Sequence, residues 1–167
     1  MLRAKLDIPE DYILILFAGK LEEKKDPLTL LNAFKSAAKK TVHLLFVGNG
    51  ILEQQLKEES GQSTSIHFMG FQNQQQMPAI YQMCDVFCLP SKGPNETWGL
   101  AINEAMAAGK AIISADKVGG SVDLVSERNG FVFQAGNVPQ LTEIIKGLDK
   151  KKLELLGEAS KIKIAPW

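Results

Sequence analysis

Two carboxylates, Glu96 and Glu104, stand in a stretch that has the pattern of a loop followed by a helix. Turn-forming residues surround Glu96, and an alanine-rich run from about Trp98 to Ala108 predicts a helix that ends at Gly109. Glu104 would lie on a helix face made of small alanine side chains, where a charge adds little to packing. A ligand that donates a pair of hydroxyls would explain it. Both glutamates are therefore candidate binding residues.

Basic residues follow the first apolar run of the chain. Tyr12–Ala18 has the pattern of a strand buried on both faces, and Gly19, Lys20 and Lys25 come after it. A lysine ammonium binds phosphate oxygens as a point charge. A helix that starts near Gly99 adds free backbone N–H groups and a partial positive charge. Ammoniums and N–H groups that face one another suit a diphosphate.

The two glutamates extend this hypothesis on either side of the diphosphate. A few residues into the helix, Glu104 can accept from adjacent hydroxyls, as a ribose diol would offer. Glu96, outside the helix, would accept from hydroxyls on a group beyond the diphosphate. Ribose, diphosphate and a hydroxyl-rich group together describe a nucleoside-diphosphate sugar.

Six short apolar runs alternate with helical patterns, which predicts an α/β fold with a parallel sheet covered on both faces. We expect one Rossmann-like, doubly wound six-stranded sheet in the order 3-2-1-4-5-6; a flavodoxin-like order of five strands is the alternative. The expected strands are Tyr12–Ala18, Val42–Val47, Ile66–Met69, Asp85–Leu89, Ala111–Ala115 and Phe131–Phe133. The other expected helices begin at Asp26-Pro27 or span Ile51–Glu59, Gln74–Met83, Gly119–Val125, Val138–Leu148 and Lys150–Ile162.

The expected strand order places the ligand crevice between the carboxyl ends of the first and fourth strands. The first strand leads to Gly19, Lys20 and Lys25, and the fourth leads to Glu96 and the helix start at Gly99. The residues with unusual chemistry are therefore the ones that the fold would bring together. Taken singly, a solvated loop is the better account of the lysines and of Glu96.

Length and charge limit the function further. The chain has 167 residues, enough for one core, and its 19 basic and 19 acidic residues cancel. Zero net charge argues against nucleic acid or an anionic membrane as the main partner. The chain has no apolar run long enough for a membrane span, and its first residues lack the pattern of a signal peptide.

The cysteines and histidines are expected to be structural. On one strand Cys84 and Cys88 would lie about 13 Å apart, too far for a disulfide, so both are expected to be reduced core residues. His43 and His67 begin strands and have no carboxylate or Cys neighbour in sequence.

The stretch that holds both glutamates resembles the signature of the retaining glycosyltransferases of family 4, which have the GT-B fold. In that signature seven residues separate the glutamates, Gly-Phe-Gly-Leu or similar follows the first, and Glu-Ala-Met-Ala-x-Gly contains the second. The segment from Phe17 to Pro27 resembles the family's Gly-Arg-Leu…Lys-Gly phosphate loop, with Lys20 in place of Arg. Trp98 replaces the usual Phe and Asp26 the usual Gly; the similarity runs from about Ile13 to Ile145.

This resemblance implies that residues 1–167 form the carboxyl-terminal, donor-binding domain, and that the amino-terminal, acceptor-binding domain is absent from the chain. It implies Glu96, Lys20 and Lys25 as the catalytic residues, with Glu96 at the donor sugar, and it places Glu104 at the ribose. It places Phe71 and Gln72 near the base. The remaining binding residues it implies are Gly19, Lys20, Lys25, Thr97, Trp98, Gly99, Leu100 and Ala101, with the diphosphate held by the two lysines and the amides of residues 99–101. Trp98 is expected to be a packing residue, with a sugar platform as the alternative.

The implied activity is transfer of a hexose from a nucleoside-diphosphate sugar, with UDP or GDP as the nucleotide, to a hydroxyl of a glycan or glycolipid during polysaccharide biosynthesis. Anomeric configuration would be kept, and no metal or other cofactor would be needed. The isolated domain is expected to be inactive. The expected location is the cytoplasm, with the inner face of the membrane as the alternative for the full-length enzyme. Two other functions stay open: a nucleotide-sugar-binding module without transfer, and a GT-B nucleotide-sugar epimerase.

Overall fold

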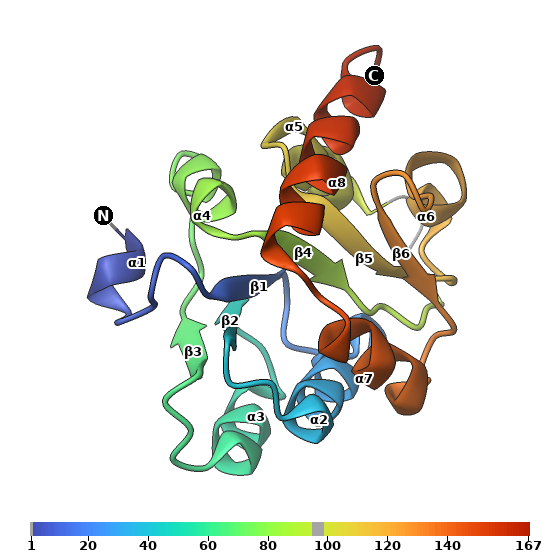
Figure 1. Ribbon diagram of the computed structural model, residues 1–167. Coiled ribbons are helices and arrows are strands. Elements are labelled where there is room, and N and C mark those ends of the chain that lie inside the picture. The colour runs from blue at the N-terminus through green and yellow to red at the C-terminus, as the bar shows by residue number, and fades with distance from the viewer. Residues whose placement is uncertain (1, 95–98) are drawn as a thin grey trace.

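A computed structural model describes residues 2–94 and 99–167 of the chain. Its centre is a six-stranded sheet in the order β3-β2-β1-β4-β5-β6, and every neighbouring pair of strands is parallel (Figure 1). This confirms the predicted fold class and strand order and excludes the five-stranded alternative. The strands are β1 (Ile13–Ala18), β2 (Val42–Val47), β3 (Ile66–Met69), β4 (Val86–Leu89), β5 (Ala111–Ala115) and β6 (Gly130–Phe133).

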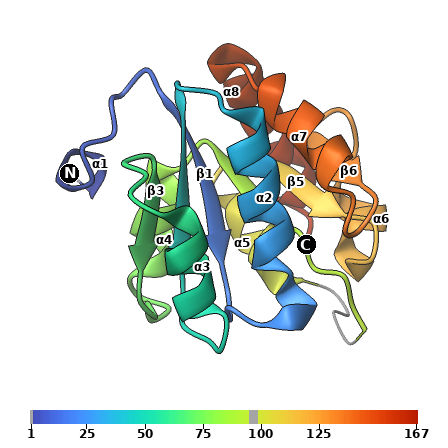
Figure 2. The same ribbon diagram turned by 90° about the horizontal axis from the view of Figure 1, so that it is seen from below.

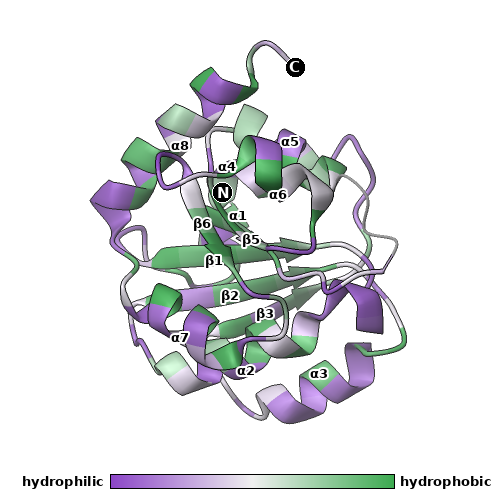
Figure 3. Ribbon diagram, turned by 90° about the vertical axis from the view of Figure 1, so that its right-hand side faces the viewer, coloured by the Kyte–Doolittle hydropathy of each residue, from purple (hydrophilic) through white to green (hydrophobic). Residues whose placement is uncertain are grey.

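The sheet separates two hydrophobic cores, one on each face. Alternate residues of β1 point into different cores: Ile15 and Phe17 belong to one, Leu14 and Leu16 to the other. This is why the strand is apolar throughout rather than alternating. In Figure 3 the green strands lie between helices that carry purple, hydrophilic segments.

Helices cover both faces of the sheet. One core includes residues of α2 (Pro27–Ala37), α3 (Glu53–Ser60) and α7 (Val138–Lys146), the helices nearest the viewer in Figure 2. The other includes residues of α4 (Met77–Met83), α5 (Leu100–Ala107) and α6 (Gly119–Leu124). The long α8 (Lys150–Ile164) contributes its first turns to the first core and Ile164 to the second.

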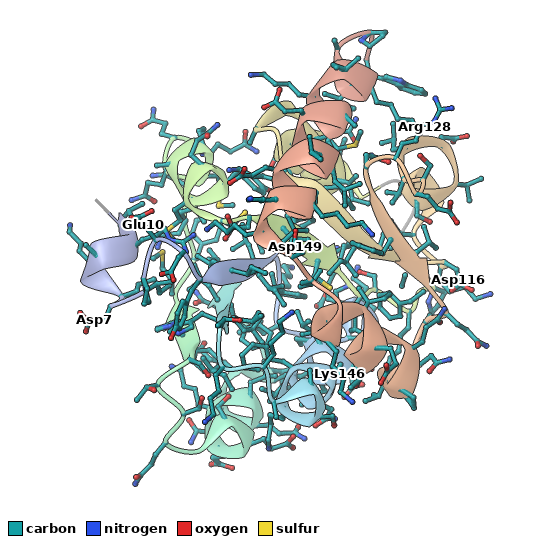
Figure 4. The ribbon with its side chains drawn as sticks, viewed as in Figure 1. Asp7, Glu10, Asp116, Arg128, Lys146 and Asp149 are labelled. Carbon is teal, nitrogen blue, oxygen red and sulfur yellow. The ribbon has the colours of Figure 1, made fainter. Side chains whose placement is uncertain are left out.

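Side chains close several helix and strand ends. Asp149, labelled in Figure 4 between α7 and α8, accepts from the N–H of Lys152 at 2.9 Å and caps α8. Asp116, at the carboxyl end of β5, accepts from the N–H of Ala135 at 2.9 Å and so holds the chain that leaves β6. Such caps satisfy N–H groups that lack a partner inside the helix.

The sequence did not predict a short helix at the start of the chain, α1 (Leu2–Lys5). It is fixed by the buried side chain of Arg3, whose Nη1 donates to the carbonyl of Met83 at 3.0 Å and to Asp85 at 3.1 Å. Asp85 also accepts from Lys150 at 3.0 Å. Glu10, labelled in Figure 4, lies 4.0 Å from Nε of Arg3. These contacts join residues distant in sequence, so no local pattern indicated the helix.

Helix boundaries differ from the predicted ones by a few residues. The largest difference is in α4, which was predicted from Gln74 but begins at Met77. The side chain of Asn73 accepts from the N–H groups of Gln75 and Gln76, each at 3.0 Å, and holds these residues in a turn instead. A 3-10 turn, η1 (Glu23–Lys25), was also not predicted.

Candidate functional site

A pocket of about 480 Å³ opens at the carboxyl ends of the strands. Its size is that of ordinary small-molecule sites. It is lined by loops after β1, β2 and β3 and by helices α4 and α5, so segments far apart in sequence meet there. The lining residues are Ala18, Gly19, Lys20, Val47, Gly48, Asn49, Phe71, Gln72, Met77, Tyr81, Ala101 and Glu104.

The first wall of the pocket is made by two main-chain segments in direct contact. Gly19 N donates to the carbonyl of Val47 at 3.0 Å, and Leu21 N donates to that of Asn49 at 2.9 Å. Gly48 has φ +136°, and a Cβ placed on it would lie 2.0 Å from the carbonyl oxygen of Gly19. Only glycine allows the loops after β1 and β2 to approach this closely.

The two predicted phosphate lysines have different positions. Lys20 is exposed and lines the pocket. Lys25 is half-buried at the end of the η1 turn and is not among the lining residues. The η1 turn is attached to the loop after β4, because Lys92 N donates to the carbonyl of Lys24 at 3.0 Å and its Nζ lies 3.3 Å from Glu23. The loops after β1 and β4 therefore lie side by side, as the predicted crevice requires.

The start of α5 lies beside this crevice. Its N-cap is Gly99, in the left-handed conformation with φ +77°. Gly99 has no side chain with which to cap the first N–H groups of α5, and uncapped N–H groups at a helix start are a common anion-binding site. A Cβ at Gly99 would lie 2.9 Å from Val118, the residue before α6, so there is no room for a side chain at this position. Leu100 is exposed and Ala101 lines the pocket.

Glu104 lies one turn further along α5 and faces the same pocket. Its Oε2 accepts a hydrogen bond of 2.9 Å from the hydroxyl of Tyr81 on α4. Tyr81 is buried, and its burial and the neighbouring carboxylate raise its phenol pKa well above the ordinary value. The phenol therefore stays a donor, and it contacts only one of the two carboxylate oxygens of Glu104.

The loop after β3 forms the far side of the pocket. Phe71 is 73 % exposed although it is a large apolar residue. Its N–H donates to Oδ1 of Asn49 at 3.2 Å, which joins this loop to the one after β2. Gln72 donates from Nε2 to the carbonyl of Gly70 at 3.2 Å. An exposed ring and an amide at the pocket edge suit a flat heterocycle.

The pocket thus contains six of the predicted residues: Gly19, Lys20, Phe71, Gln72, Ala101 and Glu104. Glu96, Thr97 and Trp98 lie outside the described residues. Sequence reasoning missed Asn49, Met77 and Tyr81 as pocket residues. Asn49 had a usable signal, because it stands between Gly48 and Gly50 directly after a strand.

No histidine or cysteine of the described residues is among those that line this pocket. Nδ1 of His43 and Nε2 of His67 are 2.9 Å apart, so the two rings share a hydrogen bond between β2 and β3. Cys84 and Cys88 are free and buried, and burial raises the pKa of the Cys84 thiol to about 12.

Within residues 2–94 and 99–167 no group of three or more His, Cys, Asp and Glu side chains could hold a metal ion. Over the same ranges, no helix combines the length and apolar character of a membrane span.

The sequence is similar to those of known proteins. The family model of the group 1 glycosyl transferases matches residues 1–162. A phosphatidyl-myo-inositol mannosyltransferase of Mycobacterium tuberculosis is 32% identical over 118 residues, 68% of this chain and 31% of that protein. A lipopolysaccharide 1,2-N-acetylglucosaminetransferase of Salmonella typhimurium is 31% identical over 130 residues, 71% of this chain and 34% of that protein. The chain spans about a third of the length of these relatives.

Solved structures show the same fold. HepE of Anabaena, described in complex with UDP, has a TM-score of 0.85 and 24% identity, and the match covers 99% of this chain and 47% of HepE. The carboxyl-terminal domain of the group 1 family protein LpcC from Francisella tularensis has a TM-score of 0.83 and 20% identity, over 98% of this chain and 89% of that one. Together with the match of the family model over nearly the whole sequence, these findings show that the chain belongs to the group 1 glycosyl transferases, with the Rossmann-like fold of the GT-B enzymes.

Proposed function

We propose that this chain is the donor-binding half of a retaining glycosyltransferase. The full enzyme would move a hexose from a nucleoside-diphosphate sugar to a hydroxyl of a glycan or glycolipid. The observation that carries the proposal is the single pocket in which a lysine, the start of a helix, a carboxylate and an exposed aromatic ring meet. Each of these groups suits a different part of a nucleotide sugar.

Different residues of the pocket would contact different parts of the nucleotide sugar. Lys20 and the first N–H groups of α5 would hold the diphosphate, with Lys25 beside them. Donors that face the diphosphate would stabilise the negative charge that grows on the departing nucleoside diphosphate. Phe71 and Gln72 would contact the base, and Glu104 the ribose.

The sugar would extend from the diphosphate toward Glu96, Thr97 and Trp98. The acceptor would come from an amino-terminal domain outside this chain. Support for that division comes from the coverage, because the chain corresponds to about a third of its curated relatives and to most of the separate LpcC domain. UDP and GDP are the nucleotides proposed, and the description of HepE in complex with UDP favours testing UDP first. The proposed location is the cytoplasm, or the inner face of the membrane for the full-length enzyme.

Calorimetry in the presence of EDTA tests the proposal. UDP or GDP should bind the purified chain without divalent metal, and the matching nucleoside should bind more weakly because it lacks the diphosphate. Titration of inorganic pyrophosphate alone is the control for simple anion binding. Equal affinity for nucleoside and nucleoside diphosphate, or binding only with magnesium or manganese present, would contradict the proposed site.

A further inference from the structure

The pocket that we assign to the nucleotide is lined by a buried hydroxyl as well as by the exposed carboxylate that it contacts. The hydroxyl belongs to Tyr81, which is 3 % exposed, and the carboxylate to Glu104. Oη of Tyr81 lies 2.9 Å from Oε2 of Glu104. The contact joins two helices that are separated in sequence by strand β4. The Tyr81 side of this contact is buried, whereas the Glu104 side chain is exposed.

The position of the Tyr81 hydroxyl is fixed by the core. The Tyr81 ring packs edge to face against Phe87, with ring centroids 5.8 Å apart, and Phe87 is a fully buried residue of β4. Glu104 is exposed, and three of its four neighbours three or four positions away along α5 are alanines, Ala101, Ala107 and Ala108. The hydrogen bond from Tyr81 is thus what selects a rotamer for the carboxylate.

A second pocket next to the first offers the Glu104 side chain another direction in which to point. A pocket of about 430 Å³ adjoins the first and shares Met77, Tyr81 and Glu104 with it. The rest of its lining comes from α4 and α5 and the residues next to them. Without the Tyr81 hydroxyl, the Glu104 side chain would be free to turn from the nucleotide pocket into this second pocket.

We propose that Tyr81 is a positioning residue that gives the pocket its preference for a ribose diol, by holding Oε2 of Glu104 so that the carboxylate faces the nucleotide. The inference rests on the proposed function, because the diol is part of the proposed donor. Oε2 keeps one lone pair after it accepts from Tyr81, and Oε1 keeps two. The held carboxylate can therefore still accept both hydroxyl hydrogens of the ribose.

The test compares UDP with 2′,3′-dideoxy-UDP, which lacks the diol but keeps the base and diphosphate. The parent chain should bind UDP more tightly than the dideoxy compound. Tyr81→Phe removes only the hydroxyl, and it should weaken UDP roughly two- to twelvefold, the cost of immobilising one flexible side chain on binding. It should leave the affinity for the dideoxy compound unchanged. Tyr12→Phe is the matched control, because Tyr12 is the only other tyrosine and precedes the amino end of β1, whereas the pocket lies at the carboxyl ends of the strands.

A double variant shows whether Tyr81 acts through Glu104. Glu104→Ala should reduce the preference for UDP over the dideoxy compound, and adding Tyr81→Phe to it should change that preference no further. Thermal unfolding of each variant establishes that it is folded before its affinity is compared. If Tyr81→Phe weakens both ligands equally, or weakens neither, Tyr81 has no positioning role and the inference is wrong. If the parent chain binds no nucleoside diphosphate, the proposed function fails first, and the two failures are thereby distinguished.

Discussion

Lys20 is the residue whose charge the proposed site uses most directly. It is exposed at the pocket edge, and the diphosphate of a bound nucleotide would lie between it and the start of α5. Lys20→Ala should weaken UDP by about 1.5 kcal/mol, the low end of the range for a hydrogen bond to a charged group, because the side chain is solvated. That is roughly tenfold in affinity by calorimetry. Affinity for uridine should not change.

Lys24 provides the control for this experiment within the same loop. Its ammonium lies 3.7 Å from Glu22, and it is not among the residues that line the pocket. Lys24→Ala should therefore leave UDP affinity close to that of the parent chain. Equal losses for the two variants would mean that only the general charge of the loop matters.

Single residues also show how far the sequence predicts the site. Glu104 could be chosen because a carboxylate among alanines has no packing role, and Gly19 and Lys20 because they follow a buried strand at the crevice. Tyr81 could not be chosen, because in sequence it looks like one more apolar residue on a helix face. Its function depends on which residue of another helix its hydroxyl reaches. That information is contained only in the packing of α4 against α5.

At the scale of elements, the contact between the loops after β1 and β2 depends on Gly48. Gly48→Ala places a methyl group against the carbonyl of Gly19 and forces an unfavourable φ. The free energy of unfolding should fall by about 2–6 kcal/mol, from overpacking and backbone strain of about 1–3 kcal/mol each. Urea denaturation measures the change, and UDP binding should be lost with it because this contact forms one wall of the pocket.

Gly147 is a matched position for that substitution. Its φ is −83°, and a Cβ there would meet its nearest neighbour, the carbonyl of Glu143, at 3.5 Å. Gly147→Ala should leave stability unchanged or raise it by up to about 1 kcal/mol, because the unfolded chain loses freedom. A comparable loss at both glycines would show that the close approach at Gly48 does not decide the effect.

The edge of the sheet formed by β2 and β3 should respond to pH. Burial and Arg3 lower the pKa of His43 below 6.5, and burial and the neighbouring His43 lower that of His67, against an opposing effect of Asp7. The unfolded chain then binds more protons than the folded chain just below pH 6.5. The contribution of the two histidines should be constant above neutral pH, and stability should fall as the pH drops from about 6.5 through their folded pKa values.

Denaturant unfolding at several pH values checks this dependence. His43 and His67 are the only histidines, so a His43→Gln, His67→Gln double variant has no imidazole left to titrate. Its stability should change much less between pH 7 and the point where carboxylates begin to titrate. A slope as steep as that of the parent chain would assign the effect to other groups.

For the whole molecule, the strand order could be predicted because each strand is a separate apolar run and one order places the unusual residues together. α1 and η1 could not be predicted, because a buried arginine and a loop-to-loop contact fix them.

The proposal that donor and acceptor bind to different domains leads to a prediction for the whole molecule. The chain alone should transfer no sugar from UDP- or GDP-sugars to an acceptor, since transfer requires both substrates in reacting geometry.

Product analysis of donor incubated with and without a glycan or glycolipid acceptor checks that prediction. Release of an epimerised free sugar from donor alone would instead support the epimerase. Turnover at a rate near that of a full-length relative would show that the chain holds the whole active site. Neither product should be detected if an acceptor domain is required.

The contacts of Arg3 have a consequence for dividing this chain into independently folding pieces. The apparent start of the domain is β1, because the alternation of strands and helices begins there. A fragment that began at β1 would lack the guanidinium that contacts the Met83 carbonyl and Asp85, and the buried carbonyl would lose its donor. The Arg3 contacts thus lie beside the amino ends of β1 and β4, at the end of the strands opposite the pocket. We therefore expect a fragment that begins at Ile13 to unfold at a lower denaturant concentration than the chain that includes α1.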